Sequence, residues 1–315
     1  MKIVFFGTPE PAAEVLQTLI DAKCEIVAAV TQPDRPQGRG QKVAFSPVKE
    51  LTLKAGLPVE QPATVRNNPG FQAYLSSLKP DLCVVAAYGK ILPQEILDIP
   101  KHGFINLHAS LLPKYRGAAP IQWALLNGEK ETGISIFKLV AELDAGPVLA
   151  RATVKIEDND NAETLTSKLF MAAGPLLIKT LREIEIGEAK DVPQNEAEAS
   201  FAPTLTKESG EIDWKKPAEE INDRIRALIT WPAAHTFFRG KRLKIFKARV
   251  EPLDIAAQAR QAGLIIEIVK NEGILVASGR GDLLLLEVQL EGKKRMKAYD
   301  FVIGHDVKTG ETLPN

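Results

Sequence analysis

The stretch Ile3-Val4-Phe5-Phe6-Gly7-Thr8-Pro9 sets the pattern for the first half of the chain. Its apolar residues, Ile3–Phe6, are typical of a short buried strand that ends at Gly7. We expect Thr8 to be the N-cap of the helix that follows, with Pro9 in its first turn. The stretch therefore predicts a strand, a tight turn and a helix.

This alternation continues along the chain. Further strands are predicted at 25–30, 81–87, 104–107, 133–139 and 147–154, and further helices at 46–55, 71–78, 120–126 and 162–187. Strands separated by helices predict a mostly parallel, doubly wound sheet, and continuously apolar strands such as Cys83–Ala86 fit a sheet that is covered on both faces. Because ligands bind at the carboxyl ends of such strands, we expect Gly7, 87–90 and 106–113 to converge on one site.

The second half of the chain has a different pattern. The segment 189–207 is polar, acidic and contains proline, which indicates a linker between a domain at 1–188 and a domain at 208–315. A helix at 217–228 precedes short strands predicted at 243–250, 263–269, 273–277 and 283–290, and this spacing favours a small antiparallel barrel. The predicted fold class is thus α/β + β, with an N-terminal Rossmann-like doubly wound parallel sheet and a C-terminal OB-like β-barrel.

Composition limits the classes of protein and the kinds of partner. A length of 315 residues favours two domains, and 45% hydrophobic with 25% charged residues is ordinary for a soluble globular protein. Lys and Arg (40) balance Asp and Glu (40), so any nucleic acid must be bound through a local patch. Cys24 and Cys83 lie in apolar runs and are expected as reduced core residues. The absence of a transmembrane-length stretch or a signal-like start predicts a cytoplasmic protein without a membrane partner.

The fold also suggests a nicotinamide-dependent oxidoreductase. That class needs several glycines after the first strand so that the backbone can approach the pyrophosphate. Here the turn is Gly7-Thr8-Pro9-Glu10-Pro11, in which two prolines lack the N–H group and Glu10 repels phosphate. We therefore predict no nicotinamide cofactor. The four histidines are scattered, so no metal site is predicted either.

Basic residues gather in the second half of the chain. Between residues 224 and 250 there is no acidic residue, and the same segment carries aromatic residues at Trp231, Phe237 and Phe238. Such a patch is typical of contacts with a phosphate backbone. The alternative is a solvated face whose acidic partners come from elsewhere in the fold, and the sequence leaves both open. The basic residues of this segment are Arg224, Arg226, Arg239, Lys241, Arg242, Lys244, Lys247 and Arg249.

The stretch 105–113 carries the chemistry. Asn106 and His108 are two positions apart in a predicted strand, so both side chains project from the same face. A carboxamide beside an imidazole can hydrogen-bond an oxygen that becomes negative when a carbonyl carbon turns tetrahedral. By base rate such pairs more often satisfy local backbone groups. Asp144, before a small-Gly-Pro turn, either orients the His108 ring or merely forms the turn.

Asn106, His108 and Asp144, together with Ser110-Leu111-Leu112-Pro113, resemble the catalytic trio and signature of the folate-dependent formyltransferases. Other segments, among them 6–9, 31–36 and 212–214, are similar to the branch of that superfamily that formylates methionyl-tRNA. The resemblance covers nearly the whole chain. It implies 10-formyltetrahydrofolate as co-substrate, initiator methionyl-tRNA as partner, no metal, and a monomer.

The resemblance also implies roles for individual residues. Asn106 and His108 are expected to stabilise the oxyanion, and Asp144, acting with a water, to hold His108 and move protons. The family often carries an acid and a glycine where Val140 and Glu142 stand, which puts the shape of this loop in question. The residues expected to hold the folate are Tyr88, Gly89, Lys90, Ile91, Leu92, Ser110, Leu111, Leu112, Pro113, Leu139 and Val140.

The loop at 31–42 is long and basic, and by resemblance it enters the acceptor-stem end of the tRNA, with Arg39 as its main contact. The alternative is that the loop is only a surface connection between a strand and a helix and makes no contact with tRNA. The residues expected to contact tRNA are Arg35, Arg39 and Lys42 in this loop, Lys114 and Arg116 near the site of formylation, and Arg239, Lys241 and Arg242 in the barrel.

Two other functions stay open on the sequence. A formyltransferase or formyl-folate hydrolase acting on a small-molecule amine would share the trio but would need neither the basic loop nor the basic barrel. A noncatalytic RNA-binding protein would have lost the activity of its α/β domain, and the intact trio argues against it.

Overall fold

The computed structural model describes residues 1–37, 42–252 and 260–314. These residues form two compact units. The N-terminal unit comprises Met1–Pro120, Glu131–Lys155 and Thr166–Ala202, and the C-terminal unit comprises Ile121–Lys130, Ile156–Leu165 and the chain from Pro203 onward. None of the helices in the described ranges is both long and apolar enough to cross a membrane.

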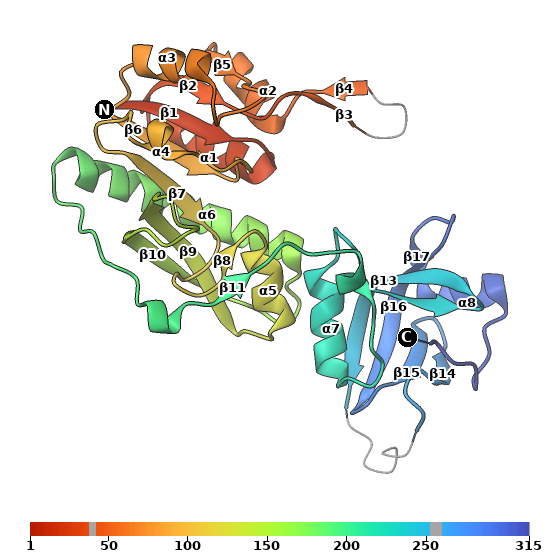
Figure 1. The fold of residues 1–315 in the computed structure, drawn as a ribbon. Coiled ribbons are helices and arrows are strands. Elements are labelled where there is room, and N and C mark those ends of the chain that lie inside the picture. The colour runs from red at the N-terminus through yellow and green to blue at the C-terminus, as the bar shows by residue number, and fades with distance from the viewer. Residues whose placement is uncertain (38–41, 253–259, 315) are drawn as a thin grey trace. The chain divides into compact units, whose positions relative to one another are not determined.

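The N-terminal unit is built on one sheet with the strand order β10-β9-β7-β6-β1-β2-β5 (Figure 1). Its strands are β1 (Lys2–Gly7), β2 (Glu25–Val30), β5 (Val59–Glu60), β6 (Leu82–Ala86), β7 (Phe104–His108), β9 (Glu131–Lys138) and β10 (Val148–Lys155). The five neighbouring strands β7, β6, β1, β2 and β5 are parallel. β9 pairs antiparallel with β7, and β10 pairs antiparallel with β9. The predicted mostly parallel sheet is thus confirmed.

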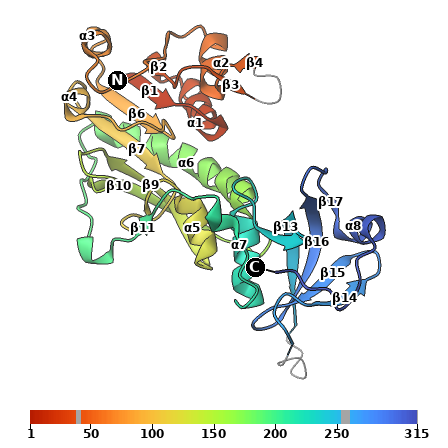
Figure 2. The ribbon, with the colours of Figure 1, turned by 45° about the vertical axis from the view of Figure 1, so that its right-hand side comes forward.

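Helices cover both faces of this sheet (Figures 1 and 2). They are α1 (Glu10–Asp21), α2 (Pro47–Lys54), α3 (Pro69–Ser77), α4 (Gln94–Leu97) and most of α6 (Ala162–Glu185), whereas α5 (Pro120–Leu126) falls almost wholly in the C-terminal unit. Phe71 of α3 and Ile96 of α4 share a buried cluster with Phe6 and Phe104, on the face to which the side chains of Asn106 and His108 also belong. Right-handed crossovers place α1 and α2 on the opposite face.

The helix start predicted at Thr8 is one residue early. Pro9 occupies the N-cap position of α1 with no side-chain cap bond, and Pro11 lies in the first turn. The Thr8 hydroxyl instead donates to the Tyr88 carbonyl oxygen at 3.4 Å. The Thr8 side chain, which the local sequence pattern predicts to cap the helix, therefore bonds to a residue far away in the sequence.

Short elements complete the N-terminal unit. β3 (Arg35–Gln37) pairs with β4 (Lys42–Ala44), and β8 (Arg116–Gly117) pairs in parallel with β11 (Phe201–Ala202). A one-turn helix spans Glu196–Glu198. The part of the expected linker up to residue 202 therefore lies along this unit, where Val192 also bridges Val148 of β10.

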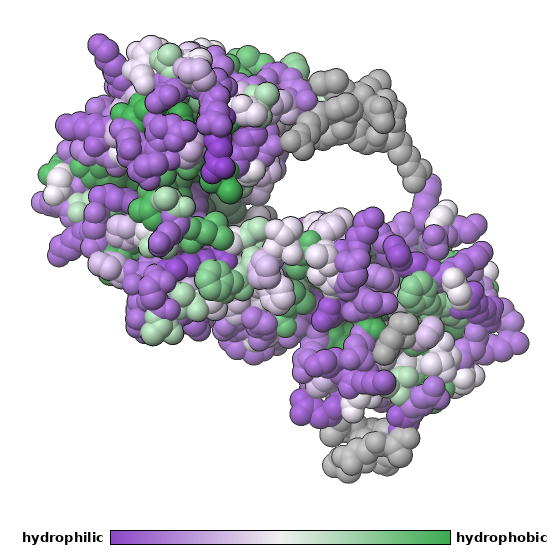
Figure 3. Space-filling model, viewed as in Figure 1, coloured by the Kyte–Doolittle hydropathy of each residue, from purple (hydrophilic) through white to green (hydrophobic). Residues whose placement is uncertain are grey.

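The C-terminal unit holds an antiparallel sheet with the order β12-β13-β16-β15-β14, to which β17 adds through β16. Its elements are a one-turn helix (Glu208–Gly210), α7 (Ala218–Ala227), β12 (His235–Phe238), β13 (Lys241–Glu251), β14 (Ile265–Val269), β15 (Gly273–Ala277), β16 (Asp282–Leu290), β17 (Met296–Lys297) and α8 (Ala298–His305). Trp214 and Phe301 are among the largest side chains of its core. The four predicted strands are confirmed within two residues at each end, and β12 and α8 were not predicted. In the view of Figure 3 the surface of this unit is mainly hydrophilic.

Candidate active site

The pair Asn106 and His108 lies on β7, in the middle of the N-terminal sheet. β7 pairs with β6 on one side and with β9 on the other, so its backbone is held from both directions. His108 ends the strand and is only 5% exposed, whereas Asn106 is half-buried. In the described part of the chain, the Asn106 side chain has no hydrogen-bond partner. Its carboxamide is thus available to a ligand.

The imidazole of His108 is fixed through both nitrogens. Nε2 lies 2.8 Å from the carbonyl oxygen of Tyr115. A carbonyl oxygen only accepts, so Nε2 carries the hydrogen and donates it. Nδ1 lies 3.7 Å from Oδ2 of Asp144, an ion-pair separation longer than a direct hydrogen bond. Phe137 packs edge-on against the ring, with centroids 6.3 Å apart.

Asp144 reaches His108 because its loop folds back over the sheet. The residue adopts a left-handed backbone conformation with φ of 50°, and its Oδ2 accepts a hydrogen bond from the Gly117 N–H at 2.8 Å. Gly146 is close enough to the Lys138 carbonyl that a Cβ would lie 1.8 Å from its oxygen, so only glycine fits there. The structure therefore brings Asp144 next to His108 across 36 residues of sequence.

A second loop, 88–92, approaches the same edge after β6. The Tyr88 carbonyl accepts from Gln32 Nε2 at 2.8 Å, and the Lys90 ammonium donates to the carbonyls of Pro62 and Ala63 at 2.7 and 2.9 Å. Gly89 has φ of 77° and lies against the Gln32 amide. These bonds fix the position of the loop at the edge of the sheet.

The Tyr88 side chain points away from solvent. It is 1% exposed, and its ring packs edge-on against Phe6 at 5.3 Å. Its hydroxyl has no hydrogen-bond partner among the described residues, and burial raises its pKa to about 12. Tyr88 therefore supports the loop from within the core, and only its backbone is placed to meet a ligand.

Apolar side chains are exposed on both loops. Ile91 is 79% exposed, Leu143 is 62% exposed and Val140 is 40% exposed. Flat, largely apolar ligands are bound by such side chains together with a few backbone polar groups. The two loops thus expose side chains of the kind that bind a flat, largely apolar ligand, whereas Leu139 packs against the core cluster that contains Leu92.

The signature Ser110–Pro113 is a buried scaffold. Ser110 is fully buried and donates to the Lys114 carbonyl at 2.6 Å, and Leu112 is 2% exposed. Ser135 on β9 ties the stretch down, because its hydroxyl donates to the Ser110 carbonyl and accepts from the Leu112 N–H. These side chains therefore shape the loop that carries Tyr115 and do not present themselves to a ligand.

The basic residues expected to contact tRNA fall into two groups. Arg116 is 4% exposed and its guanidinium is bonded to Gln194 and Glu196; the bond to Glu196 raises the Arg116 pKa. Arg239 is bonded to Glu311 and to the carbonyls at the end of α8. Both arginines are thus bonded within the protein. This agrees with the alternative that basic residues pair with acidic residues from other parts of the fold.

The other predicted cations are differently placed. Lys114, Lys241 and Arg242 are exposed, and none of them forms an ion pair with another described residue. Arg35 and Lys42 belong to the β3–β4 hairpin, and Arg39 lies outside the described residues. Three other arginines of the basic segment 224–250 also have partners. Arg224 donates to the Ser209 carbonyl, Arg226 pairs with Asp223, and Arg249 pairs with Glu251 and Glu272.

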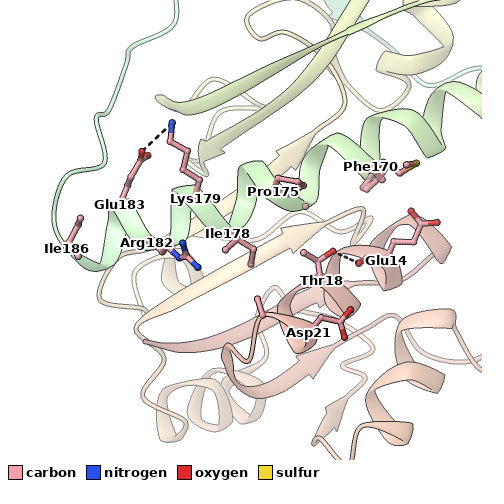
Figure 4. Close-up of a pocket in the computed structure, with 13 residues that line it drawn as sticks. Glu14, Thr18, Asp21, Phe170, Pro175, Ile178, Lys179, Arg182, Glu183 and Ile186 are labelled. Atoms are coloured by element: carbon pink, nitrogen blue, oxygen red, sulfur yellow. Dashed lines mark hydrogen bonds and ion pairs between the residues drawn. The ribbon is translucent and has the colours of Figure 1, made fainter.

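A cavity of about 810 Å³ lies away from this site, between α1 and α6. Figure 4 shows apolar side chains such as Phe170 and Ile178 on its α6 wall, facing Thr18 on α1. None of the trio lines it. Within the described ranges, no group of three or more His, Cys, Asp or Glu side chains is arranged to hold a metal ion.

Sequence reasoning missed the residues that tie the site together. Gln194 and Ser200, in the segment expected to be a linker, bond to the loops that carry Asp144 and Tyr115. Gln32 likewise bonds to the 88–92 loop. Polar residues in a polar segment carry no local signal, so only their tertiary contacts reveal them.

Comparison with known proteins agrees with this geometry. Residues 1–181 match the family model described as formyl transferase, and residues 204–306 match the formyl transferase C-terminal domain. A methionyl-tRNA formyltransferase from Dictyoglomus turgidum is 48% identical over 315 residues, covering 100% of both chains. Another from Caldanaerobacter subterraneus subsp. tengcongensis is 46% identical over 319 residues, covering 99% of this chain and 100% of that one.

A solved structure shares the fold. The N-formyltransferase from Helicobacter canadensis, in complex with folinic acid and dTDP-3-aminofucose, matches 90% of this chain and 99% of its own with a TM-score of 0.68 at 18% identity. At that identity the likeness concerns the fold alone. The full-length matches to relatives above 40% identity carry the assignment, and the chain belongs to the methionyl-tRNA formyltransferase family.

Proposed function

We propose that this protein transfers the formyl group of 10-formyltetrahydrofolate to the α-amino group of methionyl-initiator tRNA, giving N-formylmethionyl-tRNA for the start of translation. The observation that carries the proposal is the approach of Asp144 to His108 beside Asn106, on a sheet edge flanked by two apolar-tipped loops. Family membership over the full length supports the choice of substrate.

The reaction joins the amine nitrogen to the formyl carbon and breaks the bond from that carbon to N10 of the folate. One proton leaves the amine, and one is gained by the departing nitrogen. Asn106 donates to the oxyanion that forms on the formyl carbon. Nε2 of His108 is occupied by the Tyr115 carbonyl, so the Nδ1 edge beside Asp144 is the edge left to face the reacting atoms.

Asp144 then has two roles. Through Oδ2 it accepts from the Gly117 N–H and faces Nδ1 of His108, which orients the ring. With a water, it takes up the amine proton and passes it toward the folate nitrogen. Residues that shuttle protons in this way contribute about 10²–10⁴-fold to rate.

For the folate, we propose contacts with the backbone of 88–92 and with the exposed side chains of Ile91, Val140 and Leu143. This proposal departs from the expectation from sequence, because it adds Leu143 and leaves out Leu139, which packs against the core, and the side chain of Tyr88, which is buried. The side chains of Ser110, Leu112 and Pro113 are buried, so their part is to shape the loop. The chemistry proposed needs no metal, because amide, imidazole and carboxylate groups supply both charge stabilisation and proton transfer.

For the tRNA, we propose contacts from Lys114 near the site, from Lys241 and Arg242 on β13, and from the 31–42 loop with Arg39. The exposed state of the first three supports this assignment. We also propose that the C-terminal sheet closes as an OB-like barrel. Register shifts along β13 at Ile245/Lys247 and Lys247/Ala248 support it, since such irregularities let a strand bend around a barrel. The protein would act as a monomer in the bacterial cytoplasm.

The test is direct. The purified protein is incubated with 10-formyltetrahydrofolate and either charged initiator tRNA, charged elongator methionine tRNA, or a small amine such as a glycinamide ribonucleotide or an amino sugar nucleotide. Formation of N-formylmethionyl-tRNA on the initiator species is expected. Formylation of the small amine alone would establish the small-molecule alternative, and tRNA binding without any transfer would establish the noncatalytic one.

A further inference from the structure

The segment 192–202 lies between the two family matches, which end at residue 181 and resume at residue 204. Its polar composition is that of a connector, yet it is bound to the N-terminal unit along its length. Val192 exchanges backbone hydrogen bonds with Val148 at 2.8 and 3.0 Å, and Phe201 and Ala202 pair with Arg116 and Gly117. Between these anchors it passes the two loops that carry the catalytic groups.

Gln194 bonds to the Asp144 loop. Its Nε2 donates to the carbonyl oxygen of Asp144 at 2.8 Å and to that of Gly146 at 2.7 Å. Both hydrogens of the amide are therefore used on the turn that holds Asp144 in its left-handed conformation. The carboxylate of Asp144 is left free of Gln194 and faces Gly117 and His108.

The other end of the same amide bonds to the His108 loop. Gln194 Oε1 accepts from Nε and Nη2 of Arg116 at 3.1 and 2.9 Å, and Glu196 accepts from Nη1 and Nη2 of Arg116 at 2.9 and 2.7 Å. Arg116 follows Tyr115, whose carbonyl holds Nε2 of His108. One planar amide thus spans the loop of the acid and the loop that orients the imidazole.

Ser200 adds a second tie on the same loop. Its hydroxyl accepts from the Tyr115 N–H at 2.9 Å, and its carbonyl accepts from the Arg116 N–H at 2.8 Å. Tyr115 has φ of 61°, a conformation that an L residue holds only when its surroundings impose it. The segment 192–202 therefore fixes the peptide whose carbonyl orients His108.

We propose that Gln194, with Arg116, is a positioning device for the catalytic pair: it sets the separation between Asp144 and His108 without touching the substrates. The inference rests on the proposed formyl transfer. Because the amide acts on both loops at once, its loss lets Asp144 and Tyr115 shift independently. A misplacement of about 1 Å in a catalytic group costs up to about 100-fold in rate.

The experiment compares Gln194→Ala with the unchanged protein in the formylation assay, with both substrates varied. We expect kcat to fall about 10–100-fold, while KM for methionyl-tRNA changes less than about threefold, because the proposed tRNA contacts are untouched. The thermal unfolding midpoint is measured in parallel, and rates are taken well below it. A merely structural role would lower the midpoint and leave kcat per folded enzyme unchanged, which would overturn the inference.

Gln194→Glu separates the two ends of the amide. The carboxylate still accepts from Arg116 but cannot donate to the carbonyls of Asp144 and Gly146. We expect kcat to fall as far as in Gln194→Ala. Full activity in Gln194→Glu would mean that the bonds to the Asp144 loop are unnecessary, which would also overturn the inference.

Two control variants keep their activity. Glu198→Gln changes an exposed residue of the same segment whose side chain accepts from the Asn195 amide and, among the described residues, has no other partner. Gln17→Ala removes an amide of the same kind from α1, where it bonds to Asp21. If the unchanged protein formed no N-formylmethionyl-tRNA, the proposed function would fail. An active parent with a fully active Gln194→Ala variant would refute the positioning role alone.

Discussion

Replacing Asp144 by Asn separates the charge of the carboxylate from its structural role. The amide oxygen of asparagine can still accept the Gly117 N–H, so the loop keeps its anchor. What is lost is a negative charge 3.7 Å from His108 Nδ1, on a side chain that is 11% exposed, together with its capacity to take up a proton. At about 4 Å and an effective dielectric constant of about 20, two unit charges interact by about 4 kcal/mol.

That energy applies to the transition state, in which the attacking amine gains positive charge close to Asp144 while the oxyanion forms. At about 1.4 kcal/mol for each factor of ten, losing it slows the chemical step about 10³-fold. The effect belongs in kcat, because the same charge contributes little to binding of either substrate.

The assay is single-turnover formation of N-formylmethionyl-tRNA from enzyme in excess over charged tRNA, at saturating formyl-folate. The thermal unfolding midpoint of Asp144→Asn should stay near that of the parent, because the Gly117 bond is kept. A rate within about threefold of the parent would refute the electrostatic reasoning, since the charge would then contribute under about 1 kcal/mol.

Five further substitutions have expected outcomes. His108→Ala should cut the transfer rate by at least about 100-fold while leaving tRNA affinity in a filter-binding assay nearly intact, because the proposed phosphate contacts lie elsewhere. Arg39→Ala should reduce the preference for initiator over elongator tRNA in kcat/KM; equal kinetics with the parent on both would remove the loop from the proposal. Arg239→Ala should lower the thermal midpoint without changing tRNA affinity, whereas Lys241→Ala should weaken binding and reduce the magnitude of its salt slope by about one. Tyr88→Phe should stabilise the protein by about 1 kcal/mol by removing a buried hydroxyl without a partner.

The last of these changes has a pH dependence with a definite sign. Burial raises the Tyr88 pKa to about 12, above its ordinary value of 10.0. The folded state therefore resists ionisation of this group, and its contribution to stability is complete below pH 10 and is lost as the pH rises toward about 12. Urea unfolding at pH 8 and pH 11 should show a smaller alkaline loss in Tyr88→Phe, and an equal loss in both proteins would exclude Tyr88 as its source.

Much of the fold followed from local patterns. Apolar runs of strand length, punctuated by glycine and proline, gave β2, α5 and β15 with their observed bounds. The antiparallel pairing of β9 with β7 and of β10 with β9 does not follow from local patterns, because the direction of a strand depends on where its connection returns to the sheet. Thr8 was misassigned for a similar reason, since its hydroxyl bonds to Tyr88 and not to its own helix.

The candidate site likewise combines features that follow from local sequence with features that depend on tertiary contacts. Asn106 and His108 share a face because a strand repeats every two residues, so their juxtaposition is a property of the sequence. The signature at 110–113 was recognised, but its burial was not, because burial depends on Ser135 from a distant strand. Arg116 carries a charge that is usual on a surface, yet it is buried and bonds to Gln194 and Glu196, about 80 positions away.

The sequence by itself determined the strand that presents an amide beside an imidazole, the two-part architecture, and the family, because these rest on short-range periodicity and contiguous motifs. Only the tertiary structure decided that Asp144 stands 3.7 Å from His108, and that Gln194 bridges the loops of both. Such contacts join segments tens of residues apart through single hydrogen bonds, and no local pattern encodes the geometry of a loop that folds back across a sheet.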